Sequence, residues 1–287
     1  MSNSLRATLW MIGAILAFTS MAIAGRVVSL ELDTFEIMLY RSITGLVVVL
    51  IAASLAGTLR QINTSQIGLH GLRNLSHFAG QNLWFYALPI IPLTQLFALE
   101  FTSPIWVILL APVLLREKIT GVGAVAAVGG FIGVIIVTQP FETAITSGTI
   151  AAASAAVGFA FSAIFTRKLT RTQTITCIMF WLTAMQAAFG LIGAGFDGDM
   201  ALPSRDALPW IVMIGFAGLI AHFCLTTALS LAPASVVMPI DFVRLPVIAI
   251  VAAQLYNEPL DPWVFVGAAV IFGANYLNIT YAQRAKV

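Results

Sequence analysis

The stretch F-A-L-E-F-T-S-P-I-W, Phe97 to Trp106, lies inside an apolar run that spans residues 92–115. It places a carboxylate, Glu100, four residues before a proline, Pro104, in a segment that otherwise has the composition of a membrane-spanning helix. A charged side chain and a residue without a backbone N–H are both costly at membrane depth. The stretch therefore indicates that the protein needs both residues at this point of the chain.

The composition around this stretch is that of an integral membrane protein. The chain has 287 residues, of which 60% are hydrophobic and only 9% are charged. Soluble domains have roughly 25% charged residues, so this chain has too few to cover a surface in water. The net charge is +2 and the basic residues are scattered, so nucleic acid is not expected as a partner. The apolar composition predicts contact with membrane lipid. Cys177 and Cys224 lie far apart without metal-ligand spacing, so we expect reduced thiols, no metal and no cofactor.

Reading outward for apolar runs of about 20 residues predicts ten transmembrane helices joined by short loops. The loops leave no room for a soluble domain. The predicted spans cover residues 7–28, 35–56, 67–88, 92–114, 120–138, 148–167, 172–195, 207–230, 234–256 and 262–281.

The basic residues predict the orientation, because short cytoplasmic loops are enriched in Lys and Arg. With the N-terminus inside, ten of the 14 basic residues fall in inner segments, two in outer loops and two within spans. Both termini are therefore expected in the cytoplasm, as for a multi-pass protein of a bacterial inner membrane. The ten inner residues are Arg6, Arg60, Arg73, Arg116, Lys118, Arg167, Lys168, Arg171, Arg284 and Lys286.

The second half of the chain repeats the first with a constant offset of 141 residues. The offset pairs Glu100 with Asp241, and Phe101 with Phe242. Five spans in each half is an odd number, so the second copy must enter the bilayer from the opposite side. This predicts an inverted-topology repeat with domains 1–140 and 141–287, an architecture that binds substrate near the midplane between its halves. The offset also pairs Arg26 with Arg167, Ile37-Met38 with Ile178-Met179, Ala87-Leu88 with Ala228-Leu229, Pro92 with Pro233 and Glu117 with Glu258.

Three segments carry a family resemblance. They are E-L-D-T-F-E-I-M-L-Y-R at 31–41, F-T-S-P-I through L-R-E at 101–117, and D-F-V-R-L-P through E-P at 241–259. They resemble the EamA repeats of the drug/metabolite transporter superfamily, and the resemblance covers essentially the whole chain. It implies ten spans arranged as five plus five, with a central cavity lined by spans 1, 3, 4, 6, 8 and 9. The general pattern is similar to bacterial riboflavin-uptake and amino-acid-exporter members.

Four charged residues stand out within the predicted spans: Arg41, Glu100, Asp241 and Arg244. Asp241 and Arg244 are three residues apart on a helix and can form an ion pair. Arg41 is then left to compensate Glu100 or to meet an anionic substrate. Intramembrane charges indicate either substrate or proton binding, or structural ion pairs that hold the two halves together.

The prolines of spans 4 and 9 predict a local distortion beside each acid. Pro104 leaves the carbonyl of Glu100 without an N–H partner, and Pro246 does the same for the carbonyl of Phe242. Such carbonyls are tolerated at membrane depth where other helices or water satisfy them. The alternative is a kink that only improves packing.

Span 3 contains a further polar cluster. His77, Gln81 and Trp84 follow i, i+4, i+7 spacing and share one helix face, with Asn74 on the same stripe. This face is expected to line a cavity or to pack against another helix. Phe97 and Phe101, together with Trp84, are candidates to stack on a flat ligand or to form part of the core.

Two further features have structural interpretations. The small residues Gly129 and Gly133, with Ala269 and Gly273, have a spacing that allows spans 5 and 10 to pack closely or to form a homodimer contact. Glu117 and Glu258 precede these spans, where a carboxylate can cap a helix N-terminus or close the cavity.

The sequence thus predicts an all-α secondary transporter for a small molecule. It has no GxxxxGK[ST] loop, no TVGYG filter and no GxSxG or HExxH motif, so an intramembrane enzyme or a channel is a distant alternative. An aromatic, nearly neutral cavity favours uptake of riboflavin or a similar vitamin-like solute. A cavity with both signs of charge equally suits a zwitterion, so a proton-coupled amino-acid or metabolite exporter is the alternative.

Overall fold

The computed structural model describes residues 3–115, 121–139, 145–196, 198 and 200–284. Within these ranges the chain is helical and contains no β-strand, which confirms the all-α prediction. The elements are α1 Asn3–Val28, α2 Thr34–Leu55, the 3₁₀ helix η1 Leu59–Gln61, α3 Ile67–Ala87, α4 Leu93–Glu100, α5 Ser103–Leu115, α6 Gly121–Thr138, α7 Ser147–Leu169, α8 Ile175–Ala194, α9 Leu208–Leu231, α10 Ala234–Val237, the 3₁₀ helix η2 Met238–Val243, α11 Arg244–Tyr256 and α12 Pro262–Arg284.

Eight of the ten predicted spans form one helix each, and two are broken. The predicted span 92–114 is divided into α4 and α5, and the span 234–256 is divided into α10, η2 and α11. Among the described residues, seven helical segments are long and apolar enough to cross a membrane, with α4 and α5 taken together. Helix α3 is of spanning length, but its polar cluster makes it less apolar than these seven.

The ends of equivalent helices are built in the same way in the two halves. Asp33 caps α2 by accepting a hydrogen bond from the backbone N–H of Glu36, and Thr174 caps α8 through the N–H of Cys177. Pro92 and Pro233 occupy the position before α4 and α10 with nearly the same extended backbone. Both pairs are separated by 141 residues, so the sequence repeat holds at the level of local structure.

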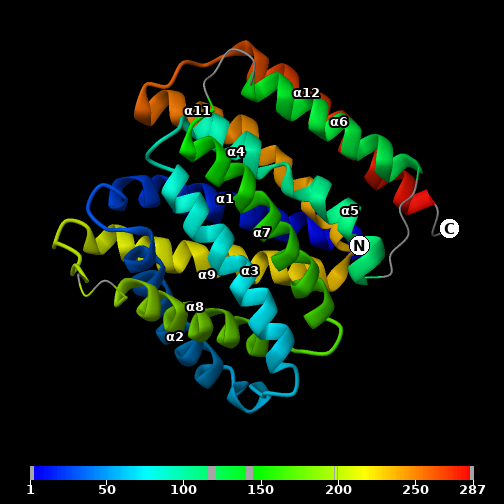
Figure 1. The fold of residues 1–287 in the computed structure, drawn as a ribbon. Helices are drawn as coiled ribbons and strands as arrows, with labels where there is room; N and C mark the ends of the chain where they lie inside the picture. Colours follow the sequence, from blue (N-terminus) through cyan, green and yellow to red (C-terminus); the bar gives the residue numbers. More distant parts are fainter. Residues whose placement is uncertain (1–2, 116–120, 140–144, 197, 199, 285–287) are drawn as a thin grey trace.

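The packing of the helices shows the same relation (Figure 1). Helix α1 lies along α9, and its repeat equivalent α7 lies along α3, the equivalent of α9. Helices α2 and α8 are equivalent and pack on each other, as do α6 and α12. Each contact thus has its counterpart when the two halves are exchanged, as expected for an inverted repeat.

Small residues let α6 and α12 approach closely. A Cβ atom added to Gly133 would lie 2.7 Å from the carbonyl oxygen of Gly267, and one added to Gly129 would lie 2.7 Å from Cβ of Ala274. The predicted small-residue contact is therefore within one chain. Its partner on α12 is Gly267 and not Gly273. A Cβ atom added to Gly273 would meet no atom within 4 Å.

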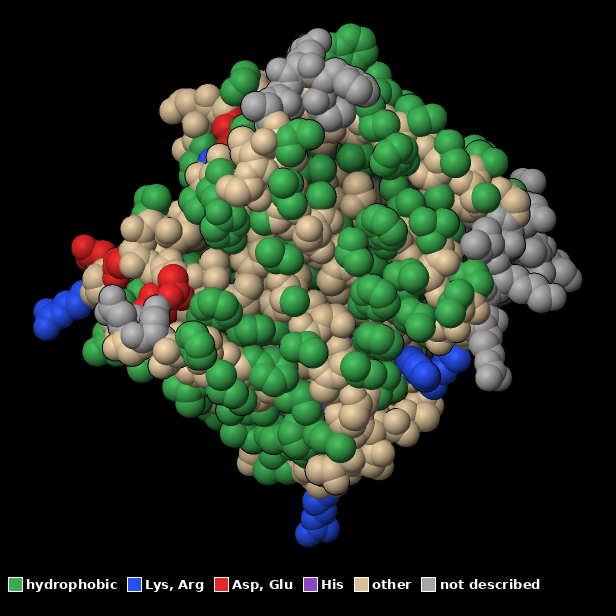
Figure 2. All heavy atoms as spheres, in the orientation of Figure 1, with side chains coloured by type: hydrophobic (Ala, Val, Ile, Leu, Met, Phe, Trp, Pro, Cys, Tyr) green, Lys and Arg blue, Asp and Glu red, His purple; other side chains and the backbone are tan. Residues whose placement is uncertain are grey.

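The outer surface is that of a protein in lipid. Large apolar side chains such as Leu55, Val113 and Phe196 are 86%, 79% and 91% exposed. Figure 2 shows a face covered by hydrophobic side chains, with Lys, Arg, Asp and Glu gathered at its edges. The start of α1 and the end of α12 lie on the same side of the molecule (Figure 1), as an even number of spans requires.

Candidate functional site

A buried cavity lies between the two halves of the chain. The volume open to the centre of a water molecule is about 60 Å³, enough for a few waters. The cavity is lined by α1, α3, the α4–α5 break, α7, α9 and the η2–α11 junction, which are the six spans that the family resemblance implied.

The cavity follows the symmetry of the repeat. Several pairs of lining residues are separated by 141 residues, so they occupy equivalent positions in the two halves. The cavity therefore lies on the pseudo-twofold axis. The pairs are Phe18 and Phe159, Met21 and Ser162, Gln81 and His222, Trp84 and Leu225, Glu100 and Asp241, and Ser103 and Arg244.

One end of the cavity holds a three-charge cluster, which we name the acid end: Glu100, Asp241 and Arg244. The Arg244 guanidinium lies 2.5 Å from Glu100 Oε1 and 2.6 Å from Asp241 Oδ2. The other oxygen of Glu100 accepts a hydrogen bond of 2.7 Å from the indole N–H of Trp84. The predicted Asp241–Arg244 pair is confirmed, but Glu100 is also bound to Arg244, so the cluster carries a formal charge of −1.

Aromatic rings surround the cation of this cluster. The guanidinium carbon of Arg244 lies 4.9 Å from the ring centres of Phe18 and Phe97 and 5.2 Å from that of Phe101. These distances are typical of cation–π interactions, which are stronger when the cation is desolvated. The acid end is therefore held by charge, hydrogen bonds and aromatic packing together.

The two prolines lie at the helix breaks that expose the acids. Helix α4 ends at Glu100, and Pro104 is the second residue of α5. Asp241 lies in η2, and Pro246 is the third residue of α11. Pro104 thus occupies the first turn of α5, where an N–H has no intrahelical partner to lose, whereas the turn of α11 that contains Pro246 follows the 3₁₀ helix η2 directly. At Glu100 the α-helix is interrupted by the two turn residues 101–102, and at Asp241 it gives way to the 3₁₀ helix η2, which runs directly into α11.

Two histidines meet at the middle of the cavity. His77 of α3 and His222 of α9 lie 2.9 Å apart between their Nε2 atoms, so one ring donates a hydrogen bond to the other. Nδ1 of His222 and Nε2 of Gln81 are buried without a hydrogen-bond partner. Buried polar atoms are nearly always paired, so these atoms indicate a site that a polar ligand or water completes.

The opposite end of the cavity is cationic, and sequence reasoning missed it. Arg73 was assigned to an inner segment, but the structure buries it to 2% exposure in the cavity wall. Its Nε donates a hydrogen bond of 3.1 Å to Thr166, and its Nη1 donates one of 2.7 Å to Asn74 Oδ1. The signal was present, because Arg73 lies seven residues inside a span and four residues before His77.

Arg41 does not compensate Glu100, contrary to one expectation. It is 6% exposed, and its hydrogen bond among the described residues is to Met38 Sδ at 3.7 Å. It lines a small space behind His222, in a layer formed with α8 and α9. Arg244 has taken the position beside Glu100, because the break before α11 brings it between both acids.

The candidate residues predicted from the sequence fall into two groups. Seven line the cavity, with Pro104 beside them, and three lie behind its wall. Asn74 positions Arg73, Phe97 packs on Trp84 and Arg244, and Arg41 lies behind His222. The seven are His77, Gln81, Trp84, Glu100, Phe101, Asp241 and Arg244.

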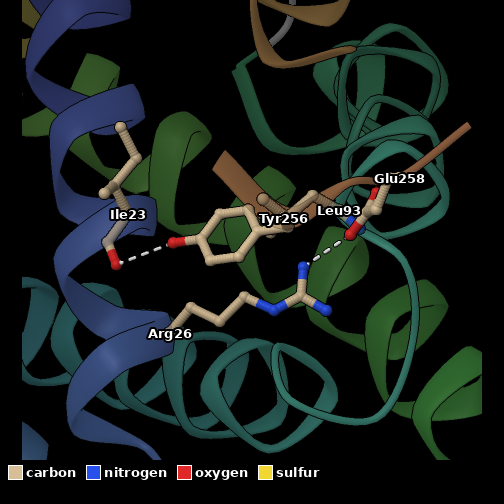
Figure 3. Close-up of polar contacts among 5 residues, drawn as sticks. All are labelled: Ile23, Arg26, Leu93, Tyr256 and Glu258. Carbon is tan, nitrogen blue, oxygen red and sulfur yellow. Dashed lines mark hydrogen bonds and ion pairs between the residues drawn. The ribbon is translucent and has the colours of Figure 1, made fainter. Parts of the chain in front are cut away.

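Contacts between the halves close one end of the bundle, which we name the Glu258 end (Figure 3). Arg26 donates a hydrogen bond of 2.6 Å to Glu258, whose carboxylate also accepts from the backbone N–H of Leu93. The Tyr256 hydroxyl donates to the carbonyl of Ile23, and the Arg26 guanidinium lies 4.8 Å from the Tyr256 ring centre. Glu258 thus caps α4 of the other half rather than α12, while Glu117 lies outside the described residues.

Comparison with known proteins identifies a matching family and several relatives. The model of the EamA-like transporter family matches residues 5–139 and again residues 146–280. A riboflavin transporter of Brucella anthropi is 31% identical over 220 residues, which cover 75% of this chain and 78% of that protein. A riboflavin transporter of Vibrio cholerae is 28% identical over 275 residues, covering 94% of this chain and 91% of that protein.

A third relative has a different substrate in its name. An S-adenosylmethionine uptake transporter of Rickettsia bellii is 25% identical over 275 residues and covers 96% of this chain and 93% of its own length. A solved crystal structure superposes with a TM-score of 0.78 at 17% identity, covering 98% of this chain and 99% of its own. That similarity shows a shared fold.

Proposed function

Since the chain belongs to the EamA-like transporter family and is a transporter rather than an enzyme, we propose that it takes up riboflavin or a similar flat, vitamin-like solute. The two inverted halves would alternate in opening the central cavity to either side of the membrane. We place it in a bacterial inner membrane with both termini in the cytoplasm, as the distribution of Lys and Arg favours.

The observation that carries this proposal is the composition of the cavity wall. Phe18, Phe101 and Phe159 contribute aromatic rings to the wall, while Gln81, Ser103 and Asp241 each have a buried polar atom without a partner. Such a wall suits a ligand that combines a flat aromatic body with several hydrogen-bonding groups. The names of two relatives agree with this choice.

The small volume of the cavity has a mechanistic consequence. The space open to water centres holds only a few water molecules, so we infer that the described conformation is closed around the binding region. Substrate binding would require the halves to separate at one end, and breaking the contacts of Arg26 and Glu258 is one way to do so.

Uptake of labelled riboflavin into proteoliposomes tests the proposal. We expect uptake above that of empty vesicles, saturation with substrate concentration, and an increase when an inward proton gradient is imposed. Protein-free vesicles serve as the inactive comparison, and Glu100→Gln protein is measured beside the wild type. Absence of riboflavin movement in either direction through correctly folded protein would exclude riboflavin as the substrate.

One observation favours a second candidate, a zwitterionic metabolite such as S-adenosylmethionine or an amino acid. The acid end has a formal charge of −1, while Arg73 lies without a carboxylate partner among the described residues at the other end. Opposite charges at the two ends would bind the two poles of a zwitterion. Competition of unlabelled S-adenosylmethionine and amino acids against riboflavin transport distinguishes the candidates, and export from preloaded vesicles tests the direction.

A further inference from the structure

We propose that Arg73 is a specificity-determining residue that binds the carbonyl-bearing edge of the substrate ring, at the end of the cavity opposite Glu100, Asp241 and Arg244. This inference rests on the proposed function, because it assigns an orientation to a flavin in the same cavity. It adds a residue that neither the family resemblance nor the intramembrane charge pattern identified.

The geometry of Arg73 is that of a side chain fixed for recognition. Thr166 of α7 holds Nε, and Asn74 of α3 holds Nη1. The Asn74 amide is itself fixed, since its Nδ2 donates to the carbonyl of Trp181 in α8 and its backbone carbonyl accepts from Gln186. Nη2 forms no hydrogen bond to a described residue, so two side chains orient the guanidinium and leave one nitrogen to bind a ligand.

The charges near Arg73 favour an electron-rich group. Arg73 forms no ion pair with a described residue, whereas Arg244 is paired with two carboxylates. The polar groups that line the same region are His77 and His222, which share a hydrogen bond, and Arg41 lies behind His222. An unpaired cation in a membrane-buried wall is costly, and a ligand oxygen that accepts its hydrogen bond lowers that cost.

The acid end complements a different chemical group. Asp241 Oδ1 is a buried acceptor without a partner, and Arg244 Nε is a buried donor without a partner. A hydroxyl group can donate to the first and accept from the second, as neither a carbonyl nor an ammonium can. The acid end therefore fits a polyhydroxyl chain.

The distance between the two ends matches a long solute. Arg73 and Trp84 are eleven residues apart on α3, which corresponds to a rise of roughly 16 Å along the helix. The wall between them contains Phe159, and Phe18 and Phe101 lie toward the acid end. A flavin would thus place its two ring carbonyls at Arg73, its tricyclic body between the phenyl rings and its ribityl chain at Asp241 and Arg244.

Binding of two flavins to purified full-length protein tests this orientation. Riboflavin and lumiflavin share the ring carbonyls, but lumiflavin has a methyl group in place of the ribityl chain. We expect Arg73→Gln to weaken the binding of both flavins by the same factor, about tenfold or more. We expect Asp241→Asn to weaken riboflavin binding and to leave lumiflavin binding unchanged.

Control variants separate recognition from folding. Arg60→Gln removes an exposed arginine from η1 and should leave the affinity for both flavins unchanged. Arg73→Lys keeps the charge but not the planar fork of donors, so an intermediate loss for both flavins is expected. If the glutamine variant does not fold, the lysine variant decides the question by itself.

The outcomes are distinguishable. Wild-type protein that binds neither flavin would overturn the proposed function and this inference with it. Wild-type protein that binds both, with unchanged affinities in the folded Arg73 variants, would overturn the inference and leave the function standing. A loss confined to riboflavin in Arg73→Gln would place the ribityl chain at Arg73 and reverse the orientation.

Discussion

Replacing Glu258 by glutamine is expected to open the Glu258 end of the bundle more often. Glu258 belongs to the second half of the chain, and both Arg26 and Leu93 belong to the first. Glutamine keeps the shape of the side chain and one acceptor oxygen, but it loses the charge that strengthens both hydrogen bonds. The closed conformation should therefore be weakened without loss of the fold.

The magnitude follows from the burial and geometry of the contact. The side chains of Arg26 and Glu258 are 20% and 11% exposed and lie 2.6 Å apart. A hydrogen bond to a charged group at such a site contributes about 1.5–3 kcal/mol. If water solvates Glu258 in the open conformation, the ratio of open to closed protein should rise roughly 10- to 150-fold.

Thiol accessibility measures this ratio. Ser103 lines the cavity and is 3% exposed, so Ser103→Cys in a Cys177→Ser, Cys224→Ser background reports on opening. A membrane-impermeant maleimide is added from the Glu258 side, and the labelling rate should rise with the population of the open conformation. Asp206→Asn is the matched control, since Asp206 is an exposed carboxylate near the same end that forms no ion pair among the described residues.

Two results would contradict the reasoning. An unchanged labelling rate in folded Glu258→Gln protein would show that the contact does not limit opening. Additive effects of Arg26→Gln and Glu258→Gln in the double variant would show that the two side chains act independently, because partners in one contact should be coupled.

Three further predictions concern other parts of the molecule. Glu100→Gln should reduce transport at least about tenfold, because Arg244 and the Trp84 indole lose a charged partner; the kinetics of solute uptake measure the loss, and full activity would leave Glu100 a structural partner. Gly158→Ala should lower the melting temperature, because a Cβ there would lie 2.9 Å from both the Ser76 carbonyl oxygen and the Gly80 Cα, whereas Gly68→Ala should not, since a Cβ at Gly68 meets no atom within 4 Å. Glu117→Gln should raise cavity labelling from the side opposite Glu258, because the offset of 141 makes Glu117 and Arg167 the equivalents of Glu258 and Arg26; labelling that increases only from the Glu258 side would contradict this.

The sequence predicted the helices well because hydrophobic length and the repeat are local or periodic signals. It also predicted the pairing of Asp241 with Arg244, since a separation of three residues on a helix is enough to bring them together. It could not predict that Glu100 joins this pair, because that contact links residues 144 positions apart across a helix break. The sequence predicted a local distortion beside each acid but not the division of each span into separate helices. A proline shows where a helix is weakened, but it does not show whether the helix bends or ends there.

The polar stripe of α3 shows a second limit of prediction from sequence, which concerns the residues of one helix face that line the cavity. Spacing placed Asn74, His77, Gln81 and Trp84 together, and three of them line the cavity. Asn74 does not, because Arg73 beside it turns into the cavity and uses the Asn74 amide as its support. Which of two adjacent polar residues faces the cavity depends on the neighbouring helices α7 and α8, and this is not encoded in the spacing on α3.

The inverted repeat explains why the cavity is central, and the differences between its halves give the two ends of the cavity different charges. The acids Glu100 and Asp241 are equivalent and both bind one arginine, whose own equivalent is Ser103. Arg73 has Ile214 as its equivalent, so the cation at the other end also occurs in one half only. A symmetric scaffold would bind the two ends of a solute alike, whereas these two substitutions give the cavity an anionic and a cationic end. We propose that the scaffold supplies the two-sided opening and that the residues that break its symmetry orient an asymmetric substrate within it.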